Sequence, residues 1–187
     1  MSERQPFHNP QHSHTARYKF ARTFVRPGDA ILDVFCGTGY GSSILLNTQA
    51  KSITAFDMFN GFPVITGIHF IQAKYPEINF APNTFTFITF FEGIEHISRD
   101  MGVNILNSIR TWLKPSGQLM LSSPNGERLI YSKERWPYHE QHYTPNELES
   151  MLNNAGFKVL DTFNQVNKVY SGFRPGPDGD FIILRCV

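Results

Sequence analysis

The fold of this 187-residue chain is decided by the stretch Leu32-Asp33-Val34-Phe35-Cys36-Gly37-Thr38-Gly39-Tyr40-Gly41. An apolar run of strand length, residues 30–35, leads into the glycines, and a short helix is predicted over residues 42–47. Glycine allows positive φ and lets a backbone approach a ligand closely. The start of the following helix offers free N–H groups. The stretch therefore predicts a strand, a tight ligand-binding turn and a helix.

An aspartate stands in register with this turn. A second predicted strand, residues 52–56, ends at Asp57, about 20 residues after Gly37. A carboxylate at that spacing meets the ribose diol of a nucleotide cofactor in sheets of this kind. The turn and Asp57 together predict a cofactor site more strongly than either does alone.

Helices and strands alternate through most of the chain, which predicts an α/β fold. The predicted helices are 15–25, 42–47, 61–75, 99–113 and 145–155, and the predicted strands are 30–35, 52–56, 86–91, 118–122, 158–166 and 181–187. The last two strands have no helix between them, so they are expected to pair antiparallel. We therefore predict a Rossmann-like, doubly wound, mainly parallel sheet with an antiparallel last strand.

The region between Asp57 and the strand at residues 86–91 is too short for a helix, a strand and a second helix. Ile68, Ile71 and Tyr75 share one face of the helix predicted there. Residues 78–80 are interpreted as a vestigial third strand, and the helix after it is missing. The fold is thus expected to be shortened around the third strand.

Composition limits the classes of protein. Residues 1–14, which include His8, His12 and His14, are predicted to be a flexible leader, and residues 15–187 a single domain. The net charge of +1 does not support a strongly basic nucleic-acid surface, although a local patch is compatible with it. The chain has no apolar run long enough to span a bilayer and only two cysteines, which favours the cytoplasm.

Several segments resemble class I S-adenosylmethionine-dependent methyltransferases, over residues 15 to 187. The stretch 32–41 resembles the first motif of that family, and Phe91-Glu92-Gly93-Ile94-Glu95-His96-Ile97 resembles its fourth-strand motif. Residues 113–119 followed by Ser123-Pro124-Asn125 resemble its fifth-strand signature, and residues 143–157 its last helix. The resemblance implies the class I methyltransferase fold and S-adenosylmethionine as the cofactor.

The resemblance also implies roles for individual residues. The main chain around Phe35, Cys36 and Gly37 is expected to face the methionine part of the cofactor, and Asp57 to accept hydrogen bonds from both ribose hydroxyls. The remaining cofactor contacts are expected from Met58 against the adenine, Phe91 beside the methyl group, and Arg17 and Tyr18 over the carboxylate. We interpret Cys36 as a packed side chain, not a nucleophile.

Two departures from the family weaken this assignment. Phe35 stands where the family has a small residue. The acidic residue near the adenine amino group has no counterpart, with only Asn79 or Asn83 as substitutes. A degenerate, non-catalytic protein of the methyltransferase fold that only binds a ligand is therefore an alternative.

Acidic and histidine side chains follow two strands that end at the same sheet edge. Glu92, Glu95 and His96 follow the fourth strand, and His139 follows the fifth, five residues before Thr144. These four residues are predicted to hold Mg²⁺ or Mn²⁺, as in two metal-using methyltransferase groups that the arrangement resembles. In the RNA-methylating one of these groups a histidine lies five residues before the threonine of the last helix, so the resemblance implies His139 rather than His142. Alternatively, Glu95 and His96 only begin a helix and bond locally.

The same side chains suit catalysis at an oxygen atom. His139, Glu92 and His96 are the candidate catalytic residues, because a hydroxyl acceptor needs a general base and imidazole titrates near neutral pH. The segment 126–143 holds cations and aromatic rings suited to a sugar, a nucleotide sugar or a nucleic-acid end, or else it is an ordinary amphipathic flap. We predict methyl transfer to a small-molecule or glycan-type acceptor, at oxygen. The alternative enzyme is a metal-assisted RNA ribose 2′-O-methyltransferase.

Overall fold

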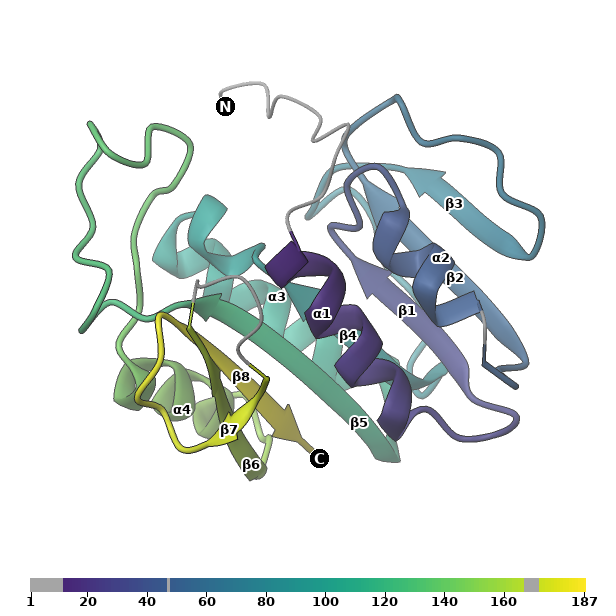
Figure 1. Cartoon of the computed structure of the whole chain (residues 1–187). Coiled ribbons are helices and arrows are strands. Elements are labelled where there is room, and N and C mark those ends of the chain that lie inside the picture. Colours follow the sequence, from purple (N-terminus) through teal and green to yellow (C-terminus); the bar gives the residue numbers. More distant parts are fainter. Residues whose placement is uncertain (1–11, 47, 167–171) are drawn as a thin grey trace.

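A twisted β-sheet forms the centre of the molecule (Figure 1). The computed structural model describes residues 12–46, 48–166 and 172–187, and within them the sheet has eight strands in the order β3-β2-β1-β4-β5-β8-β6-β7. Their bounds are β1 Ala30–Val34, β2 Ser52–Asp57, β3 Ile68–Gln72, β4 Phe85–Phe91, β5 Leu113–Pro124, β6 Val159–Gln165, β7 Arg174–Pro175 and β8 Phe181–Cys186. Strands β1 to β5 run parallel, and β8 runs antiparallel to its neighbours β5 and β6. The predicted sheet with its antiparallel last strand is confirmed.

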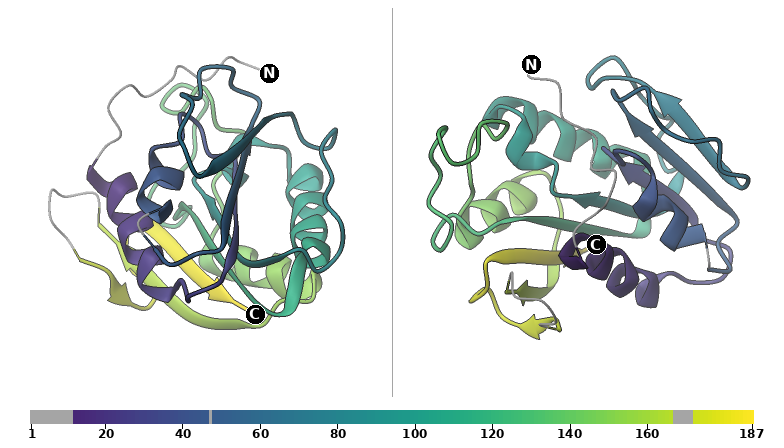
Figure 2. Two further views of the ribbon diagram at one scale, coloured as in Figure 1. Left: turned by 90° about the vertical axis from the view of Figure 1, so that its right-hand side faces the viewer. Right: turned by 45° about the horizontal axis from the view of Figure 1, so that its top comes forward.

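Helices cover both faces of the sheet (Figure 2). Helices α1, His12–Ala21, and α2, Tyr40–Leu46, pack on one face, and α3, Arg99–Trp112, and α4, Pro145–Asn154, pack on the other. Short 3₁₀ turns follow α1 at Arg22–Phe24 and precede α3 at Ile94–His96. Because both faces are covered, most residues of the central strands are apolar and buried; in β4 all residues except Thr86 are buried.

The helix termini follow the local sequence signals. The Ser98 hydroxyl accepts the N–H of Met101 at the start of α3. Thr144 and Glu147 form a reciprocal capping box at the start of α4. Helix α1 begins at His12, three residues earlier than predicted, so His12 and His14 belong to it; the rest of the predicted leader lies outside the described residues.

The prediction of a helix over residues 61–75 is wrong. This segment contains β3, which pairs in parallel with β2 so that Ile71 lies opposite Phe56. Pro63 and Gly67 disfavour a helix, and the open edge of β2 offers hydrogen-bond partners to every second residue. The third strand predicted at residues 78–80 is therefore also wrong. Residues 73–84, all described, hold no helix, which confirms the predicted loss after the third strand.

Aromatic side chains fill the space beside the shortened region. Phe80 packs edge-to-face on Phe85 and Trp112, with ring centroids 5.1 Å apart in both pairs. The Trp112 indole N–H donates to Asn79 Oδ1 at 2.8 Å. The loop at residues 73–84 therefore seals the α3 face of the sheet with rings in place of a helix.

Strand β5 starts directly at the end of α3. Residues 114–117, which lie between the predicted helix 99–113 and the predicted strand 118–122, are part of β5, where the register with β4 shifts between Phe85 and Phe87. At its other end, β5 reaches Pro124 and leads into the long loop before α4 (Figure 1). Among the described residues, no helix is long and apolar enough to cross a membrane.

Candidate active site

The glycine turn after β1 is fastened to the end of β2. Gly37 has a φ of 58°, a left-handed conformation that favours glycine. Its N–H donates to Asp57 Oδ2 at 2.8 Å, and the N–H of Cys36 donates to the carbonyl of Phe56 at 3.1 Å. The predicted register of the turn with Asp57 is therefore a direct contact.

Asp57 lies at the centre of this contact and is 4% exposed. Its second oxygen, Oδ1, accepts the N–H of Phe59 at 2.9 Å. A carboxylate oxygen has about two acceptor positions. Each oxygen of Asp57 thus holds one main-chain N–H and keeps a second position for a ligand hydroxyl.

A cleft opens beside Asp57, with an empty volume of about 770 Å³. Met58, which is half-exposed, is one of its apolar lining residues. The apolar lining comprises Phe35, Met58, Tyr75, Ile97, Met101 and Tyr138. Lys74, His96 and Glu140 add polar groups. Mostly apolar walls with a few polar groups suit a nucleoside. Asn79 and Asn83 are not among the residues that line this cleft.

The side chain of Phe35 forms a wall of this cleft. Its ring packs edge-to-face on Phe56 and Phe90, with centroid distances of 5.7 and 5.3 Å. The φ of Phe35 is 56°, which is unusual for a residue with a Cβ atom. The neighbouring Cys36 is buried, and burial raises the pKa of its thiol far above the ordinary value. Cys36 is therefore a packed, unreactive side chain.

A buried carboxylate supports the turn from beneath. Asp33 accepts hydrogen bonds from the hydroxyls of Tyr18 at 3.0 Å, Ser42 at 2.6 Å and Thr89 at 2.7 Å. Burial raises the pKa of Asp33 to about 6, against the opposing effect of these three donors. Tyr18, expected over the cofactor carboxylate, is thus placed with its hydroxyl on Asp33.

Arg17 and Glu92 meet at the carboxyl end of β4. Arg17 Nη1 lies 3.5 Å from Glu92 Oε1, and the guanidinium lies over the ring of Phe181, 4.2 Å from its centroid. Glu92 Oε1 also accepts the hydroxyl of Ser122 at 2.8 Å. Among the described residues, the Arg17 nitrogens have no hydrogen-bond acceptor although the side chain is buried. A buried guanidinium in this state is suited to an anionic ligand group. The ring of Phe91, the residue before Glu92, packs edge-to-face on the ring of Tyr18.

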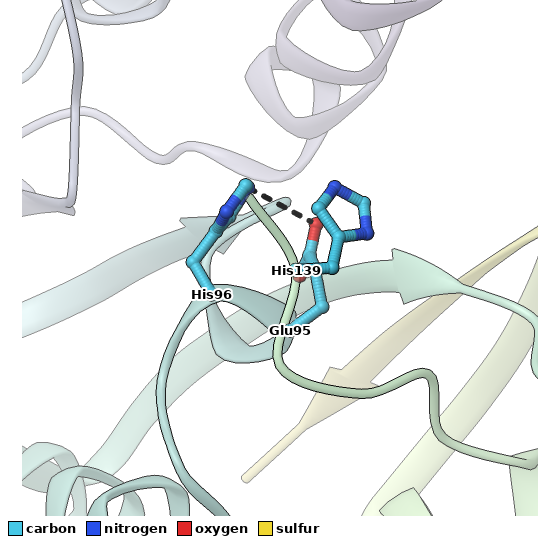
Figure 3. Close-up of side chains that lie close together, drawn as sticks. All are labelled: Glu95, His96 and His139. Atoms are coloured by element: carbon cyan, nitrogen blue, oxygen red, sulfur yellow. Dashed lines mark ion pairs between the residues drawn. The ribbon is translucent and has the colours of Figure 1, made fainter. Parts of the chain in front are cut away.

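Three of the four predicted metal ligands come together. Glu95, His96 and His139 each offer a ligand atom, and these atoms lie within 4.8 Å of one another (Figure 3). His96 Nε2 lies 3.9 Å from Glu95 Oε1, and the rings of His96 and His139 are 4.5 Å apart. Glu92, the fourth predicted ligand, is not part of this group and contacts Arg17 instead.

The loop before α4 positions His139. The N–H of Glu140 donates to the carbonyl of Glu95 at 2.8 Å, which holds the loop against the turn after β4. His139 Nδ1 lies 2.7 Å from Nε2 of His142. Burial lowers the pKa of His142, which favours its neutral ring. His142 was not among the predicted site residues; the signal in the sequence that points to it is its spacing of three residues from His139.

Several known proteins are similar to this chain in sequence. A family model described as a methyltransferase domain matches residues 9–162. A probable S-adenosylmethionine-dependent methyltransferase of Mycolicibacterium smegmatis is 27% identical over 149 residues, which cover 72% of this chain and 54% of that protein. One from Mycobacterium tuberculosis is 28% identical over 141 residues, which cover 68% and 48%. The chain spans about half the length of these curated relatives.

Solved structures share the fold. A putative methyltransferase of Haloferax volcanii, solved in complex with the Trm112 methyltransferase activator, superimposes with a TM-score of 0.77 at 16% identity, covering 95% of this chain and 90% of that chain. The N-methyltransferase NodS of Bradyrhizobium japonicum, in complex with S-adenosylhomocysteine, gives 0.74 at 13% identity, with 96% and 89% covered. At such identities the likeness shows the fold alone.

Proposed function

The chain belongs to the methyltransferase-domain family of S-adenosylmethionine-dependent enzymes, and we propose that it methylates an oxygen atom of a small-molecule or glycan-type acceptor. The contact between Asp57 and the glycine turn carries this proposal, because it holds at the cleft the carboxylate that we expect to bind the ribose of the cofactor. S-adenosylmethionine is the cofactor of this family.

The cofactor is proposed to lie across the carboxyl ends of β1, β2 and β4. The spare acceptor positions of Asp57 take the ribose hydroxyls, and Met58 contacts the adenine. The main chain at residues 35–37 faces the methionine part. The buried guanidinium of Arg17 pairs with the cofactor carboxylate, which supplies acceptors for its nitrogens. Phe35 walls the cleft, so it does not favour the non-catalytic alternative.

The acceptor is proposed to enter beside Glu92, His96 and His139. Its oxygen attacks the methyl carbon, the carbon–sulfur bond breaks, and the electron pair stays on sulfur, which leaves S-adenosylhomocysteine. The hydroxyl proton passes to an imidazole nitrogen of His139 or His96. Alignment of the two reactants supplies roughly 7–11 kcal/mol of the barrier, and the base adds to it.

A divalent cation fits the group formed by Glu95, His96 and His139. Two imidazoles and one carboxylate suit Mn²⁺ better than Mg²⁺, which prefers oxygen ligands. A bound cation supplies Lewis-acid polarisation of the acceptor hydroxyl. The metal-assisted RNA ribose methyltransferase remains the second candidate because of this group, while the net charge of +1 favours a small acceptor. We propose a cytoplasmic location, supported by two cysteines that are not disulfide-bonded.

The test measures transfer of radioactive methyl from S-adenosylmethionine to three acceptor sets: phenols, nucleotide sugars, and an RNA oligonucleotide with a free 3′ diol. Each reaction is run with EDTA and with Mn²⁺. We expect transfer to one of the first two sets and a fall of about 10²–10⁴-fold in kcat for His139→Ala. His69→Ala, on the edge strand β3, is the matched control with unchanged turnover.

Two results contradict the proposal. Unchanged turnover in His139→Ala would exclude His139 from catalysis. Transfer to the RNA oligonucleotide alone, dependent on Mn²⁺, would replace the small acceptor with the second candidate.

A further inference from the structure

A chain of hydrogen bonds runs through the loop before α4. His142 Nδ1 lies 2.5 Å from the carbonyl oxygen of Leu129, and His142 Nε2 lies 2.7 Å from His139 Nδ1. The rings of Trp136 and Tyr131 pack against His142, with centroids 4.5 and 5.5 Å away. His142 is thus held on several sides within one loop.

The chemistry of the partners determines where the protons lie. A carbonyl oxygen only accepts hydrogen bonds, so His142 Nδ1 carries a proton and donates it to Leu129. The neutral ring of His142 then has an unprotonated Nε2, which accepts. His139 Nδ1 must therefore carry a proton and donate it to His142. In a neutral His139 the unprotonated nitrogen is Nε2.

His96, another member of the group, also has a main-chain carbonyl next to its Nδ1. His96 Nδ1 lies 2.8 Å from the carbonyl oxygen of Tyr138, so this nitrogen donates, and in a neutral His96 the unprotonated nitrogen is Nε2. Both histidines then offer Nε2 as the atom that takes a proton or a cation. The carbonyl of Tyr138 fixes this tautomer in His96 directly, and the carbonyl of Leu129 fixes the same tautomer in His139 through His142.

We propose that His142 is a positioning residue, which fixes His139 in the tautomer protonated at Nδ1 so that Nε2 is its reactive nitrogen. The proposal deepens the proposed function, because it specifies the atom of His139 that takes the acceptor's proton. His142 itself touches neither substrate nor cofactor in this scheme. It acts through the orientation and the proton of His139.

The experiment reads the tautomer directly. The full chain, labelled with ¹⁵N at histidine and saturated with S-adenosylhomocysteine, is studied by long-range ¹H–¹⁵N NMR. Single His→Gln variants assign the ring signals. We expect a protonated-type shift for His139 Nδ1 and an unprotonated-type shift for Nε2. In His142→Phe, which keeps a ring but has no acceptor, we expect His139 to shift toward the tautomer protonated at Nε2.

A second variant separates positioning from folding. In His142→Gln the amide oxygen stands near the former Nε2 and accepts the same proton, so we expect the wild-type tautomer of His139. With the acceptor found in the screen above, His142→Phe is expected to lower kcat about 10–100-fold. His142→Gln is expected to restore most of it, with unchanged affinity for S-adenosylhomocysteine in both.

The outcomes distinguish this proposal from the proposed function. An unprotonated Nδ1 of His139 in the wild type, or the same tautomer in His142→Phe as in the wild type, would overturn the role of His142. The NMR result stands even if no oxygen acceptor is found, because it requires no turnover. Equal kcat values for the Phe and Gln variants would likewise overturn it.

Discussion

Replacing Asp57 with asparagine tests the proposed cofactor site. Asp57 accepts main-chain N–H groups from Gly37 and Phe59 and lines the cleft. The asparagine side chain keeps one carbonyl oxygen, and its amide nitrogen cannot accept a hydrogen bond. The variant therefore loses either the Gly37 or the Phe59 main-chain bond, together with one position for a ribose hydroxyl. A hydrogen bond to a charged group contributes roughly 1.5–3 kcal/mol. We expect Asp57→Asn to bind S-adenosylhomocysteine about 10- to 150-fold more weakly.

Isothermal titration calorimetry with S-adenosylhomocysteine measures this change without turnover. Asp29→Asn is the matched control, since Asp29 also accepts a main-chain N–H and a hydroxyl. It lies just before the amino end of β1, whereas Asp57 lies at the carboxyl end of β2. Its affinity is expected to equal that of the wild type. Thermal denaturation of both variants checks that the fold is intact.

A ligand lacking one hydroxyl separates direct contact from loop support. The 2′-deoxy form of S-adenosylhomocysteine should bind the wild type more weakly, and Asp57→Asn should discriminate less between the two ligands. Equal discrimination by the two proteins, or binding of the parent ligand within about twofold of wild type, would refute the role of Asp57 at the ribose.

Two further predictions concern the support of the glycine turn. The pKa of Asp33 rises from 3.8 to about 6 on folding, so the folded state binds more protons between these values, and the free energy of unfolding falls as pH rises through this window by about 3 kcal/mol. Urea denaturation at pH 4.5 and pH 7 covers about 2 kcal/mol of this loss, which should appear in the wild type and not in Asp33→Asn; equal pH dependence in both would contradict it. Gly41→Ala places a Cβ atom 2.1 Å from the Tyr18 ring, so we expect a loss of about 1–3 kcal/mol, and an unchanged melting temperature would show that the ring moves freely.

Local signals in the sequence predicted many elements correctly. The capping box at Thr144 and Glu147 sets the start of α4, and it acts within four residues, so no distant partner is needed. The strand and turn over residues 30–41 carry their own apolar run and glycines. The contact of Gly37 with Asp57 was predictable because a strand, a turn and a helix of usual length bring the ends of β1 and β2 together.

The errors lie where a distant partner decides. Ile68 and Ile71 fit one face of a helix, but they also fit a half-buried strand, and the segment is too short for periodicity to separate the two. The edge of β2 settles the outcome by pairing with residues 68–72. Residues 114–117 have a turn composition, yet they lie within β5, between Leu113, which pairs with Phe85 of β4, and Gln118, which pairs with Phe87.

The sequence by itself determined the mainly parallel sheet with its antiparallel last strand, the glycine turn with its aspartate, and the gathering of Glu95, His96 and His139 near the ends of β4 and β5. These follow from spacing along a doubly wound sheet. Only the tertiary structure decided that Glu92 pairs with Arg17, that Tyr18 supports Asp33, and that His142 holds His139. Each of these contacts forms only when packing brings the two side chains within hydrogen-bonding distance. Burial removes water as a partner, so each buried polar group bonds to a neighbouring protein group.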